Sequence, residues 1–201
     1  MNKPFSEACE QNKEPILAVL RQHFATVQQV VEIGSGTGQH AVYFAQHLPH
    51  LLWRPGDLSA HLAGINLWIA EAGLPNVLAP VVLDVNDPHW FVAPADGVFS
   101  ANTTHIMSWP EVVMFFDHVG QVLQPGGIFC LYGPFNYHGQ YSSDSNARFD
   151  TWLKARDPHS GIRDVDDLAL LAHQQGWVLL QDYAMPVNNR TLVWRKPKDG
   201  V

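Results

Sequence analysis

The chain has 201 residues, 46% of them hydrophobic, which fits a single domain, 1–201, with a substantial core. Its formal net charge is −7, with no long basic run to neutralise phosphates and no apolar run near the roughly 18–20 residues that span a membrane, so neither nucleic-acid nor membrane partners are expected. Two cysteines are too few for a disulfide framework, which favours a cytoplasmic protein.

The N-terminal segment, residues 1–14, is polar and charged, and we expect it to be irregular. Pro15 suits the first turn of a helix, because that turn leaves its amide hydrogens unpaired and proline has none. Apolar residues follow at helical spacing as far as Phe24. The segment before the helix is either a solvated leader or a lid over a ligand site.

A buried strand that runs into a glycine turn is the most informative stretch of the chain. Residues 30–33 are mostly β-branched, and a helical pattern covers residues 38–47. Glycine permits positive φ and lets a ligand approach the backbone closely, next to the first amides of the helix. The pattern predicts a ligand site formed by Glu32, Gly34, Ser35, Gly36 and Gly38.

The nature of the ligand follows from two positions in this turn. The dinucleotide fingerprint requires a third glycine where Gln39 stands. Glu32 would repel a pyrophosphate but attract an ammonium group. The spacing Glu-x-Gly-x-Gly-x-Gly resembles motif I of class I methyltransferases, whose cofactor, S-adenosylmethionine, carries an ammonium and a sulfonium but no phosphate. The motif therefore favours this cofactor over NAD.

Strands and helices alternate through the first two thirds of the chain, which indicates β-α-β units and a parallel sheet. Ligands in such sheets bind at the carboxyl ends of the strands, where the strand order reverses. Polar residues end each of the first four strands: Glu32, Asp57, Asp84 and Asn102. The strands are expected at 30–33, 51–57, 77–83, 96–101 and 128–132, and the intervening helices at 38–47, 59–71 and 111–122.

Three of these polar residues have separate expected roles in cofactor binding. Asp57 lies about 20 residues beyond the glycine turn, where an acid accepts hydrogen bonds from ribose hydroxyls; the alternative is an N-cap for the next helix. Asp84 would meet the adenine amino group, or else form a turn. Asn102 would reach the methionine end.

The pattern changes after the fifth strand, and residues 133–163 are expected to form an acceptor-side insertion. Residues 133–141 are aromatic and glycine-rich and are predicted to be irregular. Two helices are expected next, one capped within residues 142–146 and one over 165–174. A strand pair, 177–185 and 191–194, closes the chain. Such a closing hairpin, with an antiparallel last strand, is typical of class I methyltransferases.

Several short motifs along the chain resemble the uncharacterised class I methyltransferases grouped as domain of unknown function 938, which include an animal methyltransferase-like protein. The resemblance implies an α/β, Rossmann-like fold with a seven-stranded, mostly parallel sheet, an antiparallel last strand and helices on both faces. It supports the cofactor but supplies no acceptor. The main motifs are Asn12-Lys13-Glu14-Pro15-Ile16, Gln39-His40, Gly133-Pro134-Phe135, Gly161-Ile162-Arg163-Asp164 and Met185-Pro186-Val187-Asn188-Asn189.

The first functional hypothesis is a methyltransferase acting on a small-molecule acceptor. Aromatic side chains with a few polar groups are the usual lining of a small-ligand pocket. His105 and His138 are candidate bases from their position, and Tyr137 is a further candidate catalytic residue. The pocket is predicted to be lined by Trp109, Phe135, Tyr137 and Tyr141, with the N-terminal segment over it.

The second hypothesis is a cofactor-binding module without catalysis of its own, acting through a protein partner that docks on residues 135–141. A nicotinamide dehydrogenase is disfavoured at Gln39 and Glu32. A metal hydrolase is rejected, because the histidines are not accompanied by cysteines or carboxylates at ligand spacing.

Overall fold

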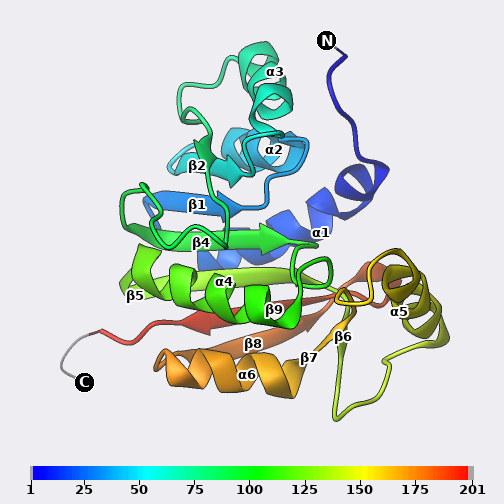
Figure 1. Ribbon diagram of the computed structural model, residues 1–201. Helices are drawn as coiled ribbons and strands as arrows, with labels where there is room; N and C mark the ends of the chain where they lie inside the picture. Colours follow the sequence, from blue (N-terminus) through cyan, green and yellow to red (C-terminus); the bar gives the residue numbers. More distant parts are fainter. Residues whose placement is uncertain (1, 199–201) are drawn as a thin grey trace.

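The computed structural model describes residues 2–198, which fold around one seven-stranded sheet with the strand order β3-β2-β1-β4-β5-β9-β8 (Figure 1). A second, two-stranded sheet pairs β6 with β7. The strands are β1 (Gln29–Ile33), β2 (Leu52–Asp57), β3 (Val81–Val82), β4 (Ala95–Ala101), β5 (Leu123–Gly133), β6 (Phe135–Asn136), β7 (Arg163–Asp164), β8 (Val178–Ala184) and β9 (Arg190–Arg195). The helices are α1 (Glu7–His23), α2 (Gln39–His47), α3 (Leu62–Ala72), α4 (Trp109–Val122), α5 (Asp144–Arg156) and α6 (Val165–Gln174), with a 3-10 turn at Pro186–Asn188.

Strands β1 to β5 are parallel, and β9 lies between β5 and β8, antiparallel to both. The predicted fold class is therefore confirmed, including the antiparallel last strand. The carboxyl ends of β1, β2, β4, β5 and β8 all lie at one edge of the sheet, which we call the carboxyl edge. Because β1 pairs with both β2 and β4, the strand order reverses there, at the place where open α/β sheets bind ligands.

The core has two halves, one on each face of the sheet. Alternate residues of β1 separate them: Val30 packs with α1 and α2, whereas Val31 packs with α4 and α6. The α1/α2 face is centred on Phe24, Phe44, Trp53 and Phe99, and the α4/α6 face on Phe115, Phe116, Phe129, Trp177 and Trp194. Burial on both faces explains why the strands read as apolar runs.

The N-terminal segment corrects one expectation, because residues 7–14 are helical. Helix α1 begins at Glu7, with Ser6 as its N-cap accepting a hydrogen bond from the Cys9 amide (3.4 Å). Acidic residues in the first turn complement the helix dipole. Pro15 therefore lies inside the helix, where burial of the apolar face beyond it offsets its missing hydrogen bond. In the described part of the chain, residues 2–6 lie before the helix.

Prolines and glycines also shift the strand boundaries. Strand β3 is reduced to Val81–Val82, with Val77 forming an isolated bridge to Trp53, because Pro80 offers no amide donor to the ladder. Strand β5 begins at Leu123 rather than at the expected residue 128, and it includes Pro125, Gly126 and Gly127 opposite an irregularity in β4.

The region beyond β5 differs from expectation at one point and agrees at three. Residues 133–141 are not wholly irregular, because they include β6, which pairs with β7. Strand β7 follows α5 in the sequence. The predicted helices are present as α5, capped by Ser143, and α6, and β8 and β9 form the closing hairpin. Helix α3, expected over residues 59–71, begins at Leu62.

Candidate functional site

The glycine turn is fastened to β2 by backbone hydrogen bonds. The amides of Gly34 and Ser35 both donate to the Gly56 carbonyl (2.9 and 3.1 Å), and the Ser35 hydroxyl accepts from the Gly56 amide (3.1 Å). Gly34, Gly36 and Gly38 have φ of 75°, 58° and 90°. The predicted strand–turn–helix arrangement is therefore present at the carboxyl edge, with a rigid turn.

Two glycines of this turn have different surroundings. A Cβ at Gly34 would lie 2.3 Å from Thr103 Cγ2, so a glycine is required at this position. Thr103 belongs to the loop that follows β4, residues 102–108, which we call the β4 loop. A Cβ at Gly36 would meet no atom within 4 Å. The backbone of Gly36 is thus the part of the turn that a ligand can approach.

Glu32 lies beneath the turn with 2% of its surface exposed, and its Oε2 accepts a hydrogen bond from Trp53 Nε1 (3.0 Å). Burial raises the pKa of the Glu32 carboxyl to about 7, although hydrogen bonds from Trp53 and Ser35 counter the rise. A buried carboxyl of this kind is stabilised in its ionised form by a nearby cation.

Asp57 joins the turn to the end of β2. Its carboxylate accepts hydrogen bonds from the amides of Gly36 (2.6 Å) and Leu58 (2.7 Å), and His61 Nδ1 lies 2.7 Å from Oδ1. A carboxylate has about four acceptor sites, so Asp57 can still accept a further hydrogen bond. Asp57 is not the cap of α3, whose N-cap is His61.

Asp84 and Asn102 also lie where their strands end. Asp84 Oδ1 accepts from the Asn86 amide (2.9 Å), which is the turn role considered as its alternative, and Asp84 stays half-buried. Asn102 has a φ of 60° and donates its amide to the Tyr132 carbonyl (2.9 Å). Its positive φ directs the chain away from β4 at the carboxyl edge.

His105 lies close to Asn102. An ideal Cβ at Gly133 would lie 3.9 Å from Asn102 Oδ1 and 4.0 Å from His105 Nδ1, so both groups flank the end of β5. The His105 ring packs edge-on against Phe149. Burial and the nearby Arg163 lower the pKa of His105 to about 4, which leaves the imidazole neutral at pH 7.

The other two catalytic candidates have different surroundings. The His138 side chain is 81% exposed, and its Nδ1 lies 2.7 Å from Asp166. Tyr137 donates its hydroxyl to Asp182 (2.6 Å), and burial and this carboxylate raise the pKa of the phenol. Within residues 2–198, neither side chain has a hydrogen bond to the glycine turn or to His105.

The predicted aromatic pocket is not formed as one unit. Phe135 is fully buried in the α4/α6 core, and the half-exposed Tyr141 donates its hydroxyl to Asp150 (2.7 Å). Trp109 instead borders a surface hollow of about 440 Å³ at the start of α4. The expectation fails because β6 pairs with β7 and turns Phe135 inward.

Gln39 has a role that the sequence did not reveal. Its side-chain oxygen accepts from the Ser6 amide (2.5 Å), and its side-chain nitrogen donates to the Ser6 carbonyl (3.3 Å). The segment before α1 is held further by Trp68 Nε1, which donates to the Pro4 carbonyl (2.7 Å), and by Lys3, whose ammonium pairs with Glu71. Residues 2–6 therefore lie against the start of α2 and the side of α3.

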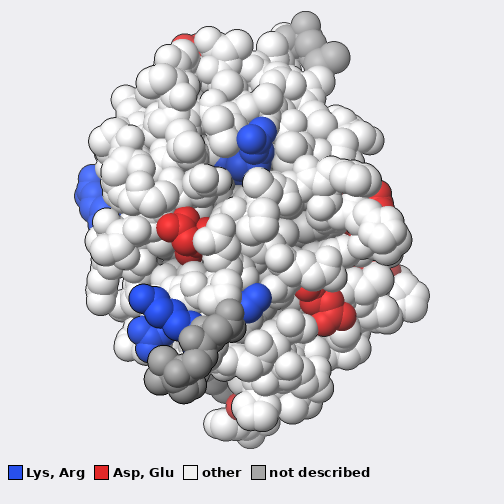
Figure 2. All heavy atoms as spheres, turned by 90° about the vertical axis from the view of Figure 1, so that its left-hand side faces the viewer, with Lys and Arg blue, Asp and Glu red and all other residues white. Residues whose placement is uncertain are grey.

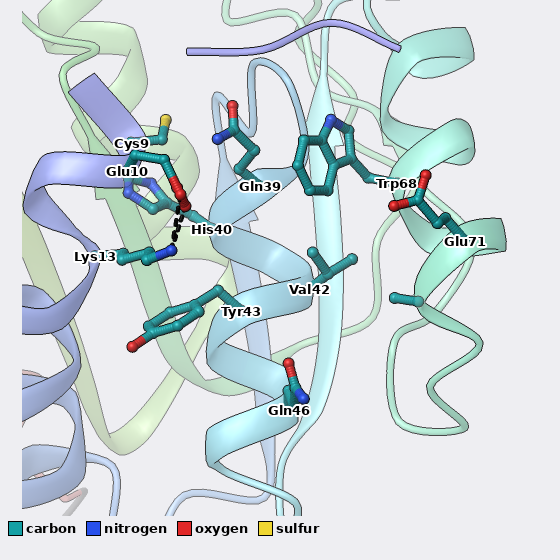
Figure 3. Close-up of a pocket in the computed structure, with 11 residues that line it drawn as sticks. Cys9, Glu10, Lys13, Gln39, His40, Val42, Tyr43, Gln46, Trp68 and Glu71 are labelled. Atoms are coloured by element: carbon teal, nitrogen blue, oxygen red, sulfur yellow. Dashed lines mark hydrogen bonds and ion pairs between the residues drawn. The ribbon is translucent and has the colours of Figure 1, made fainter. Parts of the chain in front are cut away.

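A groove of about 220 Å³ lies between α1, α2 and α3 (Figure 3). On its α1 side, Lys13 pairs with Glu10 of the same helix and lies over the Tyr43 ring. His40, which also lines the groove, donates from Nε2 to Asn12 Oδ1 (2.7 Å) and so joins α2 to α1. Because all its lining residues belong to these three helices, this groove is separate from the ends of β4 and β5.

Residues 2–198 show neither a membrane-spanning helix nor a cluster of metal ligands. None of the helices described combines the length and apolar character needed to cross a bilayer. The same part of the chain contains no group of three or more His, Cys, Asp or Glu side chains that could hold a metal ion. On the face seen in Figure 2, basic and acidic side chains are interspersed among uncharged ones.

The fold is that of solved methyltransferases. An O-methyltransferase family protein from Burkholderia thailandensis matches with a TM-score of 0.82 at 16% identity, over 93% of this chain and 57% of that one. The S-adenosylmethionine-dependent methyltransferase SibL gives 0.81 at 22%, over 95% and 56%. The O-methyltransferase NcsB1 from neocarzinostatin biosynthesis, in complex with S-adenosylmethionine and 2-hydroxy-5-methyl naphthoic acid, gives 0.77 at 17%, over 93% and 54%.

At these identities the likeness shows the fold alone, and the chain spans little more than half the length of each of these structures. The family is shown by sequence instead. A family model described as "Protein of unknown function (DUF938)" matches residues 3–196. The chain therefore belongs to the DUF938 family.

Proposed function

We propose that this protein is an S-adenosylmethionine-dependent methyltransferase that acts on a small molecule. One observation carries the proposal: the open backbone of Gly36 bonds to one acid, Asp57, in a turn that directly follows a second, buried acid, Glu32, at the point where the strand order reverses. The methyltransferase fold of the chain supports it.

The residues at the carboxyl edge fit this cofactor. Glu32 would hold its ammonium group, and the remaining acceptor capacity of Asp57 would take a ribose hydroxyl. Asp84 would face the adenine amino group and Asn102 the methionine end, with Ser35, Gly34 and Gly38 shaping the turn. When bound, S-adenosylmethionine supplies a methyl group that its sulfonium makes electrophilic.

His105 is the best-placed base for the acceptor. Its neutral imidazole, beside Asn102 and Gly133, can take a proton from the acceptor. A pKa of about 4 makes it a weak base, but the hydroxyl of an acceptor becomes strongly acidic as its oxygen gains a methyl group. His138 and Tyr137 are weaker candidates, because each side chain already pairs with a carboxylate.

A small acceptor is also favoured by the comparison. NcsB1 is described in complex with a naphthoic acid, which is a small molecule. The partner-docking alternative has less support, because Phe135, which was expected on the docking face, is buried. Cys9 and Cys130 are both free, which suits the reducing cytoplasm in which we place the protein.

Calorimetric titration of the full chain with S-adenosylmethionine, with NAD as a control ligand, tests the proposal. We expect saturable binding of S-adenosylmethionine alone, weakened at least roughly tenfold by Glu32→Gln, since a buried charge pair is lost. Asp96→Asn is the matched control, because Asp96 accepts backbone amides of Gln28 and Gln29 at the opposite edge of the sheet. Binding of NAD, or of neither ligand, would overturn the proposal. Binding without turnover across a panel of acceptors would favour the partner-acting module.

A further inference from the structure

The surface hollow beside Trp109 lies on the acceptor side of the carboxyl edge. Trp109 begins α4 directly after the β4 loop, Gly139 follows β5, and Asp167 lies in the first turn of α6. Its volume of about 440 Å³ falls in the range of small-molecule sites. The lining residues are Trp109, Asn136, Gly139, Ile162, Arg163, Asp164 and Asp167.

The floor of the hollow is held rigidly by Arg163. Its Nε donates to the Thr104 carbonyl (3.0 Å), and its Nη2 donates to the carbonyls of Met107 and His159. The guanidinium is therefore directed into the loop that carries His105, and Arg163 positions this loop. Its acceptors are uncharged carbonyls, so Arg163 also brings one positive charge to the lining of the hollow.

Asp164 holds two other segments of the lining, the turn at residues 137–140 and the start of α6. Its Oδ1 accepts from the Asp166 amide (2.9 Å) and caps α6, and its Oδ2 accepts from the Gly139 amide (2.7 Å). The turn at residues 137–140, which has positive φ at His138 and Gly139, is thereby held at the rim. Each oxygen of Asp164 retains a second acceptor site.

The groups left to meet a ligand are acceptors and an aromatic face. Among residues 2–198, Asp167 has no hydrogen bond or ion pair from its side chain, and it is exposed. The Trp109 side chain is 38% exposed. An indole face attracts cations more strongly than any other aromatic side chain. The lining holds two carboxylates, Asp164 and Asp167, and one guanidinium, Arg163, so its formal charge is −1. Because Arg163 already donates to three carbonyls while Asp167 is unpaired among the described residues, the hollow favours a cationic group over an anionic one.

We propose that this hollow binds the protonated amino group of the acceptor, with Asp167 and Trp109 as its main contacts. The assignment rests on the proposed function, because it treats the hollow as part of the acceptor site. A protonated amine has no lone pair, so this group anchors the molecule and a different atom receives the methyl group. The substrate class is therefore a small amine that carries a second, nucleophilic group.

Three small probes that share a phenol ring and differ in the charge of the tail test the selection by charge. Tyramine carries a cationic tail, 4-ethylphenol a neutral tail and 3-(4-hydroxyphenyl)propionate an anionic one. We expect the full chain to bind tyramine roughly tenfold more tightly than 4-ethylphenol, and the propionate least, when binding is measured by calorimetry at pH 7. A reversed order, or no binding of any probe, would overturn the assignment.

Variants locate the binding. Asp167→Asn should weaken tyramine roughly threefold and leave 4-ethylphenol unchanged, because only the charge is removed. Trp109→Leu should also weaken tyramine, by loss of the cation–π contact. Asp166→Asn is the matched control, since Asp166 lies in the same turn but faces His138. If Asp166→Asn and Asp167→Asn have the same effect, the hollow is not the site.

S-adenosylmethionine binding to the same protein samples separates this inference from the proposed function. If the cofactor binds while the probes show no preference for positive charge, only the amine assignment fails. If tyramine binds as expected and the cofactor does not, the hollow is a cation site, and both the methyltransferase proposal and the acceptor role of the hollow fail.

Discussion

The two ends of the carboxyl edge are built in different ways. Around the glycine turn the contacts are made by backbone: Gly34 and Ser35 bond to Gly56, and Asp57 bonds to the Gly36 amide. Beyond β5 the contacts are made by side chains, such as Arg163 on the β4 loop. The first region depends on the absence of Cβ atoms, whereas the second depends on which way each side chain points.

This difference determines how substitutions should act in each region. In the cofactor region a single added methyl group can block a ligand without disturbing the fold, as at Gly36. In the acceptor region, removing a buried side chain such as Phe135 should lower the stability of the fold. Removing an exposed side chain such as Trp109 should weaken ligand binding instead. Matched pairs of substitutions therefore separate a loss of stability from a loss of binding.

The largest effect should come from Phe135. Phe135→Ala removes a fully buried ring from the α4/α6 core and should lower the free energy of unfolding by about 3–5 kcal/mol. Trp109→Ala, which removes a partly exposed ring, should cost about 1 kcal/mol or less. Urea denaturation measures both. A loss of stability for Phe135→Ala as small as that for Trp109→Ala would contradict the burial of Phe135 in the core and would favour the predicted pocket position.

The next effect concerns methyl transfer. Once an acceptor is found, His105→Gln should lower kcat by about 100-fold or more, which is typical for loss of a general base. His138→Gln should change it less than about threefold, because His138 is exposed and paired with Asp166. Transfer of a radiolabelled methyl group measures both. A larger loss with His138→Gln would reverse the assignment of the base.

The pH dependence of stability should also divide between the regions. Burial lowers the pKa of His40 and of His105 to about 4, so each stays neutral in the folded state while it protonates near pH 6.5 when unfolded. Each histidine therefore favours unfolding as the pH falls, by about 2 kcal/mol between pH 7 and 5. Glu32, whose pKa is raised to about 7, takes up a proton in the folded state and gains a similar amount over the same range.

In the cofactor region the contributions of His40 and Glu32 thus cancel, and the net loss of about 2 kcal/mol comes from His105. Comparing urea denaturation at pH 7 and pH 5 checks this. His105→Gln should nearly abolish the loss, and Glu32→Gln should roughly double it. An unchanged pH dependence in both variants would contradict the burial of these two groups.

The same division explains what the sequence could predict. The glycine turn, Asp57 and Asn102 were placed correctly at strand ends, because strand periodicity and glycine spacing are local properties of the chain. The role of Gln39 and the inward position of Phe135 depend on contacts with Ser6 and with Arg163 in β7, which are far away in sequence. The start of α1 differs from the expectation because Ser6 caps the helix at Glu7, whereas the prediction placed its first turn at Pro15.

The central claim is that the backbone of Gly36 contacts the cofactor, and a matched pair of glycines tests it most directly. Gly36 and Gly73 have nearly equal φ, 58° and 59°, and a Cβ at either would meet no atom within 4 Å. Replacement by alanine should therefore cost both variants the same, roughly 1–2 kcal/mol of stability.

Calorimetric titration with S-adenosylmethionine should then separate the two variants. We expect Gly73→Ala to bind like the unaltered protein and Gly36→Ala to bind at least roughly tenfold more weakly, because the new methyl group occupies the approach to the turn. Equal affinities in the two variants would contradict the proposed site.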